Sequence, residues 1–214
     1  VYTQPPSPQG RGMVIQYSSV HQEAIQHEIP VFHPKDFKEK ETINTFINLK
    51  ADLVVVMAYG KLLPLNILNI PSYGCINIHV SLLPRWRGAA PVEYALLSGD
   101  KQTGVSIFRL ISEIDAGPIL SKVSIPIDQA INKEDLLEKL NSIGKNLLLE
   151  TLPNYLNNKI KPEEQNTKEV TYASKISSEL TKINFNDNPV NIFNKVRAFS
   201  PKPGAWFIFN NERF

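Results

Sequence analysis

The run Leu53-Val54-Val55-Val56-Met57 decides the fold class of this 214-residue chain. A short, continuous run of β-branched residues is typical of a strand that is buried on both faces, as in parallel sheets covered by helices. Further segments with a strand pattern lie at residues 75–80, 104–110 and 119–127. Segments with a helical pattern lie at residues 41–50, 91–98 and 132–152. This alternation predicts an α/β domain of the Rossmann-like type with a mostly parallel sheet.

The segments outside this alternation suggest where the domain ends. Residues 4–17 are rich in Pro, Gly and Ser and predict a loop, followed by a short helix at 19–28 and a short strand at 29–32. We expect a catalytic domain over residues 1–160, a linker and connecting helix over 161–200, and the start of a second module over 201–214. Because the chain opens at Val1 and stops at Phe214 inside strand-like runs, we expect a fragment of a longer protein.

Composition excludes several classes of protein. Lys and Arg total 23 against 21 Asp and Glu, so a polybasic arm or acidic tail is not the main feature, and any RNA-binding surface must be local. Cys75 is the one cysteine, which excludes an intrachain disulfide and fits a cytoplasmic compartment. The longest apolar run, residues 53–59, is far shorter than the roughly 20 residues of a membrane helix.

Three polar residues stand near the predicted strand ends, where open α/β sheets bind their ligands. Asn77 and His79 are two positions apart, so on a strand they point to the same face, and Asp115 lies in a Gly-flanked loop after another strand. An amide can stabilise an oxyanion, an imidazole can move a proton, and a carboxylate can orient the imidazole. The set favours acyl transfer, although from spacing alone a structural role is the more common interpretation.

Other conspicuous residues favour ordinary roles. Cys75 in mid-strand is typical of a core cysteine rather than a nucleophile, and Trp86 is typical of a packing residue. The remaining histidines have no metal-ligand spacing, and Gly10 and Gly12 form no phosphate-binding motif. Lys61, Arg85 and Arg87 fit either a basic rim for RNA or a solvated face.

Three motifs extend the pattern around the polar trio. They are Gly74-Cys75-Ile76-Asn77-Ile78-His79-Val80-Ser81-Leu82-Leu83-Pro84-Arg85-Trp86-Arg87-Gly88-Ala89-Ala90-Pro91, Gly99-Asp100 with Thr103-Gly104-Val105, and Asp115-Ala116-Gly117-Pro118-Ile119-Leu120. Together they closely resemble the 10-formyltetrahydrofolate-dependent formyltransferases. Further segments resemble those members of the family that act on initiator methionyl-tRNA, at residues 3–12, 58–64, 171–175 and 197–204.

The resemblance implies an enzyme that transfers the formyl group of 10-formyltetrahydrofolate to the α-amino group of initiator methionyl-tRNA, for translation initiation. Asn77, His79 and Asp115 would be its catalytic residues, without a metal ion. The folate co-substrate would contact Gly60, Lys61, Leu62, Leu63, Ser81, Leu82, Leu83, Pro84 and Ile114. The tRNA would contact Arg11, Arg85 and Arg87, although Met13-Val14-Ile15 stands where the family is often basic.

The resemblance also implies a formyltransferase domain that leads into a C-terminal β-barrel of the OB type, largely missing here. The protein is expected to be a monomer in the cytoplasm, or in an organellar matrix if eukaryotic, with no membrane partner. Three alternatives stay open: a formyltransferase for a sugar-nucleotide amine or other small amine, a formyltetrahydrofolate hydrolase, and a non-catalytic RNA- or folate-binding module. The trio argues against the last alternative but does not distinguish among acceptors.

Overall fold

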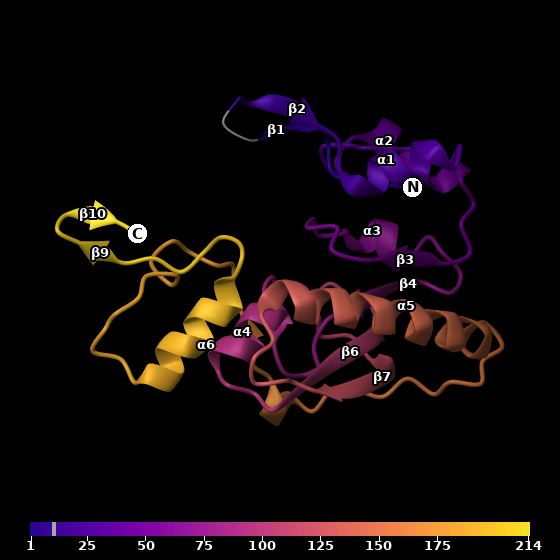
Figure 1. Cartoon of the computed structure of the whole chain (residues 1–214). Coiled ribbons are helices and arrows are strands. Elements are labelled where there is room, and N and C mark those ends of the chain that lie inside the picture. Colours follow the sequence, from indigo (N-terminus) through magenta and orange to yellow (C-terminus); the bar gives the residue numbers. More distant parts are fainter. Residues whose placement is uncertain (10–11) are drawn as a thin grey trace. The chain divides into compact units, whose positions relative to one another are not determined.

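The computed structural model describes residues 1–9 and 12–214, which form two compact units. Unit 1 is Val1–Cys75 and unit 2 is Ile76–Phe214. Figure 1 shows the whole chain in sequence colours, with helices and strands labelled where there is room.

Unit 1 contains short strands and helices. They are β1 (Ser7–Gln9), β2 (Val14–Gln16), α1 (Ser19–Gln26), α2 (Lys40–Asn48), β3 (Val54–Val56) and α3 (Leu65–Leu68). The side chain of Ser18 caps α1 by accepting a hydrogen bond from the His21 amide (3.1 Å). The loop prediction for residues 4–17 is wrong in part, because β1 and β2 pair antiparallel within it and Val14-Ile15 has high strand propensity.

An aromatic cluster forms the core of unit 1. Phe37, Phe46 and Ile67 are buried in it, and Tyr2 stacks on Phe32 with ring centroids 5.0 Å apart. The strand expected at residues 29–32 is reduced to one parallel bridge between Phe32 and Tyr2. Val55 of β3 is 42% exposed, so its β-branched run reports strand propensity rather than burial on both faces.

The phenol groups of Tyr2 and Tyr59 lie inside this cluster. Among the described residues neither buried hydroxyl has a hydrogen-bond partner. Burial raises the pKa of both tyrosines, and proximity to Tyr59 raises the pKa of Tyr2 further. The folded state therefore favours the neutral phenols. Their contribution to the free energy of unfolding is present below a pH of about 10 and is lost as the pH rises beyond that value.

We expect Tyr2→Phe to raise the free energy of unfolding by about 1 kcal/mol, because it removes a buried hydroxyl with no partner. The variant should also lose less stability than the wild type when the pH is raised from 9 to 11. Urea denaturation at both pH values measures the two effects. A lower free energy of unfolding at pH 9 would contradict the assignment of an unpartnered hydroxyl.

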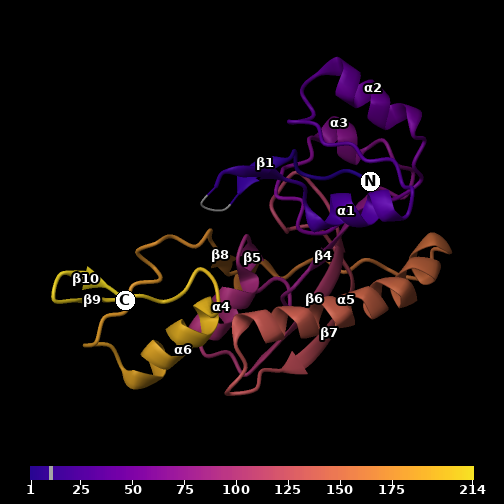
Figure 2. The ribbon, with the colours of Figure 1, turned by 45° about the horizontal axis from the view of Figure 1, so that its top comes forward.

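Unit 2 holds the longer strands and helices. They are β4 (Cys75–His79), β5 (Arg87–Gly88), α4 (Pro91–Leu97), β6 (Gln102–Arg109), β7 (Ile119–Pro126), α5 (Lys133–Leu156), the 3₁₀ turn η1 (Thr167–Glu169), β8 (Tyr172–Ala173), α6 (Pro189–Phe199), β9 (Ile208–Phe209) and β10 (Glu212–Arg213). Asn132 caps α5 as expected, by accepting a hydrogen bond from the Asp135 amide (3.0 Å). Helix α6 packs beside α4, which Figure 2 shows from a second direction.

The sheet of unit 2 is antiparallel, with β6 between β4 and β7. The expected parallel pairing is therefore not found among these three strands. The β6–β7 connection, residues 110–118, is too short for the crossover that parallel neighbours need. Parallel pairing does occur between the short strands β5 and β8, where Arg87 lies opposite Tyr172.

The two faces of this sheet differ in character. Helix α5 lies against β6 and β7, as Figure 1 shows, and a Cβ added at Gly144 would lie 3.2 Å from Ile78 Cγ2. Ile78 therefore points toward α5. Its neighbours Asn77 and His79 point to the other face, beside Phe108 and Ser106 of β6. The polar residues of the predicted site lie on the face that α5 does not cover.

Gly104 is required where β6 passes β7. A Cβ added there would lie 1.9 Å from the Val123 carbonyl oxygen and 2.6 Å from Leu82 Cδ2. We expect Gly104→Ala to lower the free energy of unfolding by about 3 kcal/mol and Tm by roughly 8 °C, because the strand backbone must move. Thermal unfolding tests this against Gly12→Ala, whose added Cβ has 3.6 Å to its nearest atom. Equal Tm values for the two variants would contradict the steric argument.

Candidate active site

His79, at the end of β4, is held between two acceptor groups. Its Nε2 lies 2.8 Å from the carbonyl oxygen of Trp86 and its Nδ1 lies 3.7 Å from Oδ2 of Asp115. A carbonyl oxygen can only accept, so Nε2 carries a hydrogen and donates it. The imidazole is 6% exposed, with the edge of Phe108 against it at a centroid distance of 6.4 Å. The ring is thus fixed with both nitrogens directed at acceptors, an arrangement that accommodates the protonated form.

Asp115 reaches His79 from the β6–β7 loop. Its backbone is left-handed, with φ of 48°, a conformation that Asp tolerates better than most residues. Its Oδ2 also accepts a hydrogen bond from the Gly88 amide (2.8 Å). The loop returns at Gly117, where an added Cβ would lie 1.8 Å from the Arg109 carbonyl oxygen. Backbone geometry, not the carboxylate alone, therefore presents Asp115 to the imidazole.

Asn77 completes the predicted trio on the same strand. It is half-buried, pairs in register with Phe108, and shares the face of His79. The structure thus brings His79 and Asp115 together and places Asn77 one strand repeat away. The amide, imidazole and carboxylate are the groups that a reaction through an oxyanion intermediate requires.

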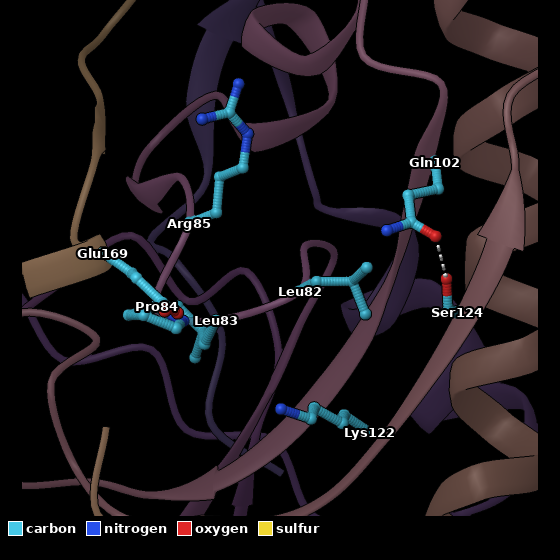
Figure 3. Close-up of a pocket in the computed structure, with 8 residues that line it drawn as sticks. All are labelled: Leu82, Leu83, Pro84, Arg85, Gln102, Lys122, Ser124 and Glu169. Carbon is cyan, nitrogen blue, oxygen red and sulfur yellow. Dashed lines mark hydrogen bonds between the residues drawn. The ribbon is translucent and has the colours of Figure 1, made fainter. Parts of the chain in front are cut away.

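The segment Ser81–Pro84 is pinned onto β6. The Ser106 hydroxyl donates to the Ser81 carbonyl (2.7 Å) and accepts from the Leu83 amide (3.0 Å). Leu83 is 1% exposed, and it lines an open groove of about 780 Å³ together with Leu82 and Pro84. Figure 3 shows this groove, whose other lining residues are Arg85, Gln102, Lys122, Ser124 and Glu169. The trio is not among its lining residues, so the groove and the trio are separate features of unit 2.

The other residues expected to contact folate belong to unit 1, apart from Ile114 in unit 2. In unit 1, Gly60 has a left-handed backbone, Leu62 is exposed and Leu63 packs on the aromatic cluster. Lys61 Nζ donates to the carbonyl oxygens of Pro34 (2.7 Å) and Lys35 (2.6 Å). Burial lowers the pKa of Lys61, and the charge of Asp36 opposes this shift. In unit 2, Ile114 is 52% exposed and directly precedes Asp115.

The three arginines expected to contact tRNA differ. Arg85 is half-exposed, stacks on the Trp86 ring at 4.2 Å, and donates two hydrogen bonds to the Asp100 carboxylate (2.8 and 2.7 Å). Hydrogen bonding to Asp100 raises the pKa of Arg85. The side chain of Arg87 is 5% exposed, which removes it from any surface that an RNA could contact. Arg11 lies outside the described residues.

Sequence reasoning missed the segment that follows α5. Residues 159–168 have the polar composition of a linker, yet Gln165 is buried beside the trio. Farther along, the Thr171 hydroxyl accepts from the Trp86 amide (2.9 Å), and the Thr171 carbonyl accepts from the Arg87 amide (2.9 Å). The segment therefore holds Trp86 and the strand β5 in place. Only the resemblance of residues 171–175 pointed to this part of the chain, and nothing in the sequence marked Gln165.

Two negative findings concern the described residues, 1–9 and 12–214. No group of three or more His, Cys, Asp or Glu side chains there is placed to hold a metal ion. None of the helices in these ranges has the length and apolar character needed to cross a membrane.

The fold and the polar cluster define a Rossmann-like α/β domain with an Asn–His–Asp group at its strand ends. The family model described as formyl transferase matches residues 1–152, and the model for the formyl transferase C-terminal domain matches residues 175–214. The chain belongs to the formyl transferase family.

Proteins that are similar to this chain include several formyltransferases. A methionyl-tRNA formyltransferase of Legionella pneumophila strain Paris is 44% identical over 208 residues, which are 97% of this chain and 66% of the relative. The chain thus spans about two thirds of that relative's length. Among solved structures, a 4-N formyltransferase from Francisella tularensis is 25% identical with a TM-score of 0.76, covering 91% of this chain and 79% of that one. HypX from Aquifex aeolicus, solved with tetrahydrofolic acid, has a TM-score of 0.72 at 20% identity and shares the fold over 92% of this chain and 35% of its own.

Proposed function

We propose that this protein transfers the formyl group of 10-formyltetrahydrofolate to the α-amino group of initiator methionyl-tRNA in the cytoplasm. The observation that carries the proposal is the fixed imidazole of His79 between the Trp86 carbonyl and the Asp115 carboxylate. The 44% identity to a methionyl-tRNA formyltransferase supports the choice of acceptor.

The reaction requires one bond to form and one to break. The methionyl amine attacks the formyl carbon, which gives a tetrahedral intermediate with a negative oxygen. Collapse of the intermediate breaks the bond from the formyl carbon to N10 of the folate. The amine loses a proton and N10 gains one, so the transfer balances without a redox partner.

The trio suits each part of this reaction. The neutral imidazole of His79 would first take the proton of the attacking amine at Nδ1, directly or through water, because Nε2 already donates to the Trp86 carbonyl. The resulting imidazolium and the Asn77 amide would then stabilise the developing oxyanion, and the imidazolium would release the proton to N10. Asp115, 3.7 Å from Nδ1, would stabilise the positive charge that the imidazole acquires.

The remaining contacts extend the same proposal. We assign the folate to the backbone and apolar side chains of Gly60, Lys61, Leu62, Leu63, Ser81, Leu82, Leu83, Pro84 and Ile114. Arg85 and Arg11 are assigned to the tRNA, whereas the buried side chain of Arg87 has no such role in this proposal. Residues 1–160 would form the catalytic domain of a monomer, residues 161–200 the linker and connecting helix, and residues 201–214 the start of the C-terminal barrel.

A second acceptor is supported by the likeness to the Francisella 4-N formyltransferase. The trio performs formyl chemistry on any amine, so an amino group on a sugar nucleotide would fit the same geometry. A hydrolase, with water in place of the amine, is the third outcome to separate.

Transfer of a labelled formyl group distinguishes these functions. The full-length protein would be mixed with labelled 10-formyltetrahydrofolate and either initiator methionyl-tRNA or an amino-sugar nucleotide. We expect label on the methionyl amine. Label on the sugar amine, or release of formate with both acceptors present, would overturn the proposed acceptor.

A further inference from the structure

Gln165 is a buried amide whose hydrogen-bonding capacity is used on both sides. It is 8% exposed. Its Nε2 donates to the carbonyl oxygens of Asp115 and Gly117, both at 2.8 Å. Its Oε1 accepts from Nε of Arg87 at 3.0 Å. A primary amide has two N–H donors, so both donor bonds can be made at once.

These bonds join the two segments that hold His79. Asp115 and Gly117 belong to the loop that presents the carboxylate to Nδ1. Arg87 lies between Trp86 and Gly88 in the sequence. The Trp86 carbonyl accepts from Nε2 of His79, and the Gly88 amide donates to the Asp115 carboxylate. One side chain therefore fixes the spacing between both partners of the imidazole.

Gln165 itself is anchored to the sheet. Two residues before it, the backbone of Glu163 exchanges both hydrogen bonds with Ile119 at the start of β7 (2.7 and 2.8 Å). The segment therefore follows the edge of the sheet rather than extending freely after α5. Arg87 is also held by Glu113 (3.1 Å), so its guanidinium keeps one partner if Gln165 is replaced.

We propose that Gln165 is a positioning residue that sets the distance between the Asp115 carboxylate and the His79 imidazole. The effect of Gln165 on activity rests on the proposed function. Its effect on the geometry around His79 does not depend on which acceptor the protein uses.

Gln165→Met keeps the length of the side chain and removes all three hydrogen bonds. In the full-length protein we expect kcat for formyl transfer to fall about 30-fold, by analogy with the hydrogen bonds that orient metal-binding side chains, whose loss typically costs about 10- to 100-fold in activity. KM for the folate and for the tRNA should each change less than about threefold, since no substrate contact is removed. Gln129→Met is the matched control, because Gln129 is exposed in the turn after β7. A kcat for Gln165→Met within threefold of the control would overturn the proposal.

Gln165→Glu gives a signature that a purely structural role would not produce. The introduced carboxylate keeps an acceptor for Arg87 but faces two carbonyl oxygens without a donor. When it binds a proton it can donate to one of them. We expect the activity relative to wild type to rise as the pH falls, whereas the ratio for Gln165→Met stays constant. Parallel pH profiles for the two variants would contradict the role.

A measurement without turnover separates this proposal from the proposed function. The ring ¹⁵N resonances of His79 report which nitrogen carries hydrogen, and we expect the Nδ1 resonance to move in Gln165→Met but not in Gln129→Met. An unmoved resonance would overturn the positioning role whatever the activity. If the resonance moves but the protein transfers no formyl group to tRNA, the positioning role is supported and the proposed acceptor is wrong.

Discussion

His79→Ala is expected to lower kcat/KM for formyl transfer by about 1,000-fold, within the range for loss of a general acid–base group. The variant loses the ring that donates to the Trp86 carbonyl and faces Asp115. It therefore loses the proton carrier and one donor to the oxyanion together. Folate binding should be nearly unchanged, because the neighbouring segment Ser81–Pro84 is held by the Ser106 hydroxyl and not by the imidazole.

His79→Gln separates chemistry from folding in this prediction. Its amide can still donate to the Trp86 carbonyl, but it cannot carry a proton at neutral pH. Single-turnover kinetics with labelled folate measures the chemical step, and thermal unfolding monitors the fold. His27→Ala is the matched control, because His27 lies at the end of α1, exposed and paired with Glu23. A His79→Gln variant that keeps more than a tenth of wild-type turnover would show that another group carries the proton.

The elements of this fold could be predicted where hydrophobic periodicity is strong. The helix at 132–152 and the strand at 119–127 correspond to α5 and β7, because long apolar faces leave little choice of structure. The direction of strand pairing was not predictable in the same way. A β-branched run indicates a strand but not the direction of its pairing. The short connection between β6 and β7 requires antiparallel neighbours, whereas β4 pairs with β6 across the intervening β5 and α4.

The candidate site also has one part that the sequence predicts and one part that it does not. The period of two on a strand placed Asn77 and His79 on one face, and the structure has them there. The approach of Asp115 depends on a left-handed backbone and on the bonds of Gln165, which no local pattern encodes. Arg87 was expected on the surface because it is charged and lies close to Arg85 and Trp86 in the sequence. Its side chain is in fact buried.

Asp115→Asn is expected to lower kcat about 300-fold with little change in Tm. The atom at the Oδ2 position accepts from the Gly88 amide, so the amide oxygen of the new side chain must occupy it. Asn also adopts the left-handed backbone readily, and here φ is 48°. Shape, hydrogen bond and backbone are thus kept, and only the negative charge beside Nδ1 is removed. The expected loss is of the size seen when a group that stabilises the charge of a transition state is removed.

Asp115→Ala tests whether that loss comes from charge or from geometry. Alanine also loses the bond to Gly88 and pays about 1–2 kcal/mol for the left-handed backbone, so its Tm should fall by several degrees. If the charge is what matters, kcat falls by a similar factor in both variants, while Tm falls only in Asp115→Ala. Stopped assays over pH 6–9 and thermal unfolding give both quantities, with Asp135→Asn, exposed in the first turn of α5, as control. A kcat for Asp115→Asn within threefold of that control would mean that the carboxylate only shapes the loop, and that His79 works without a charged partner.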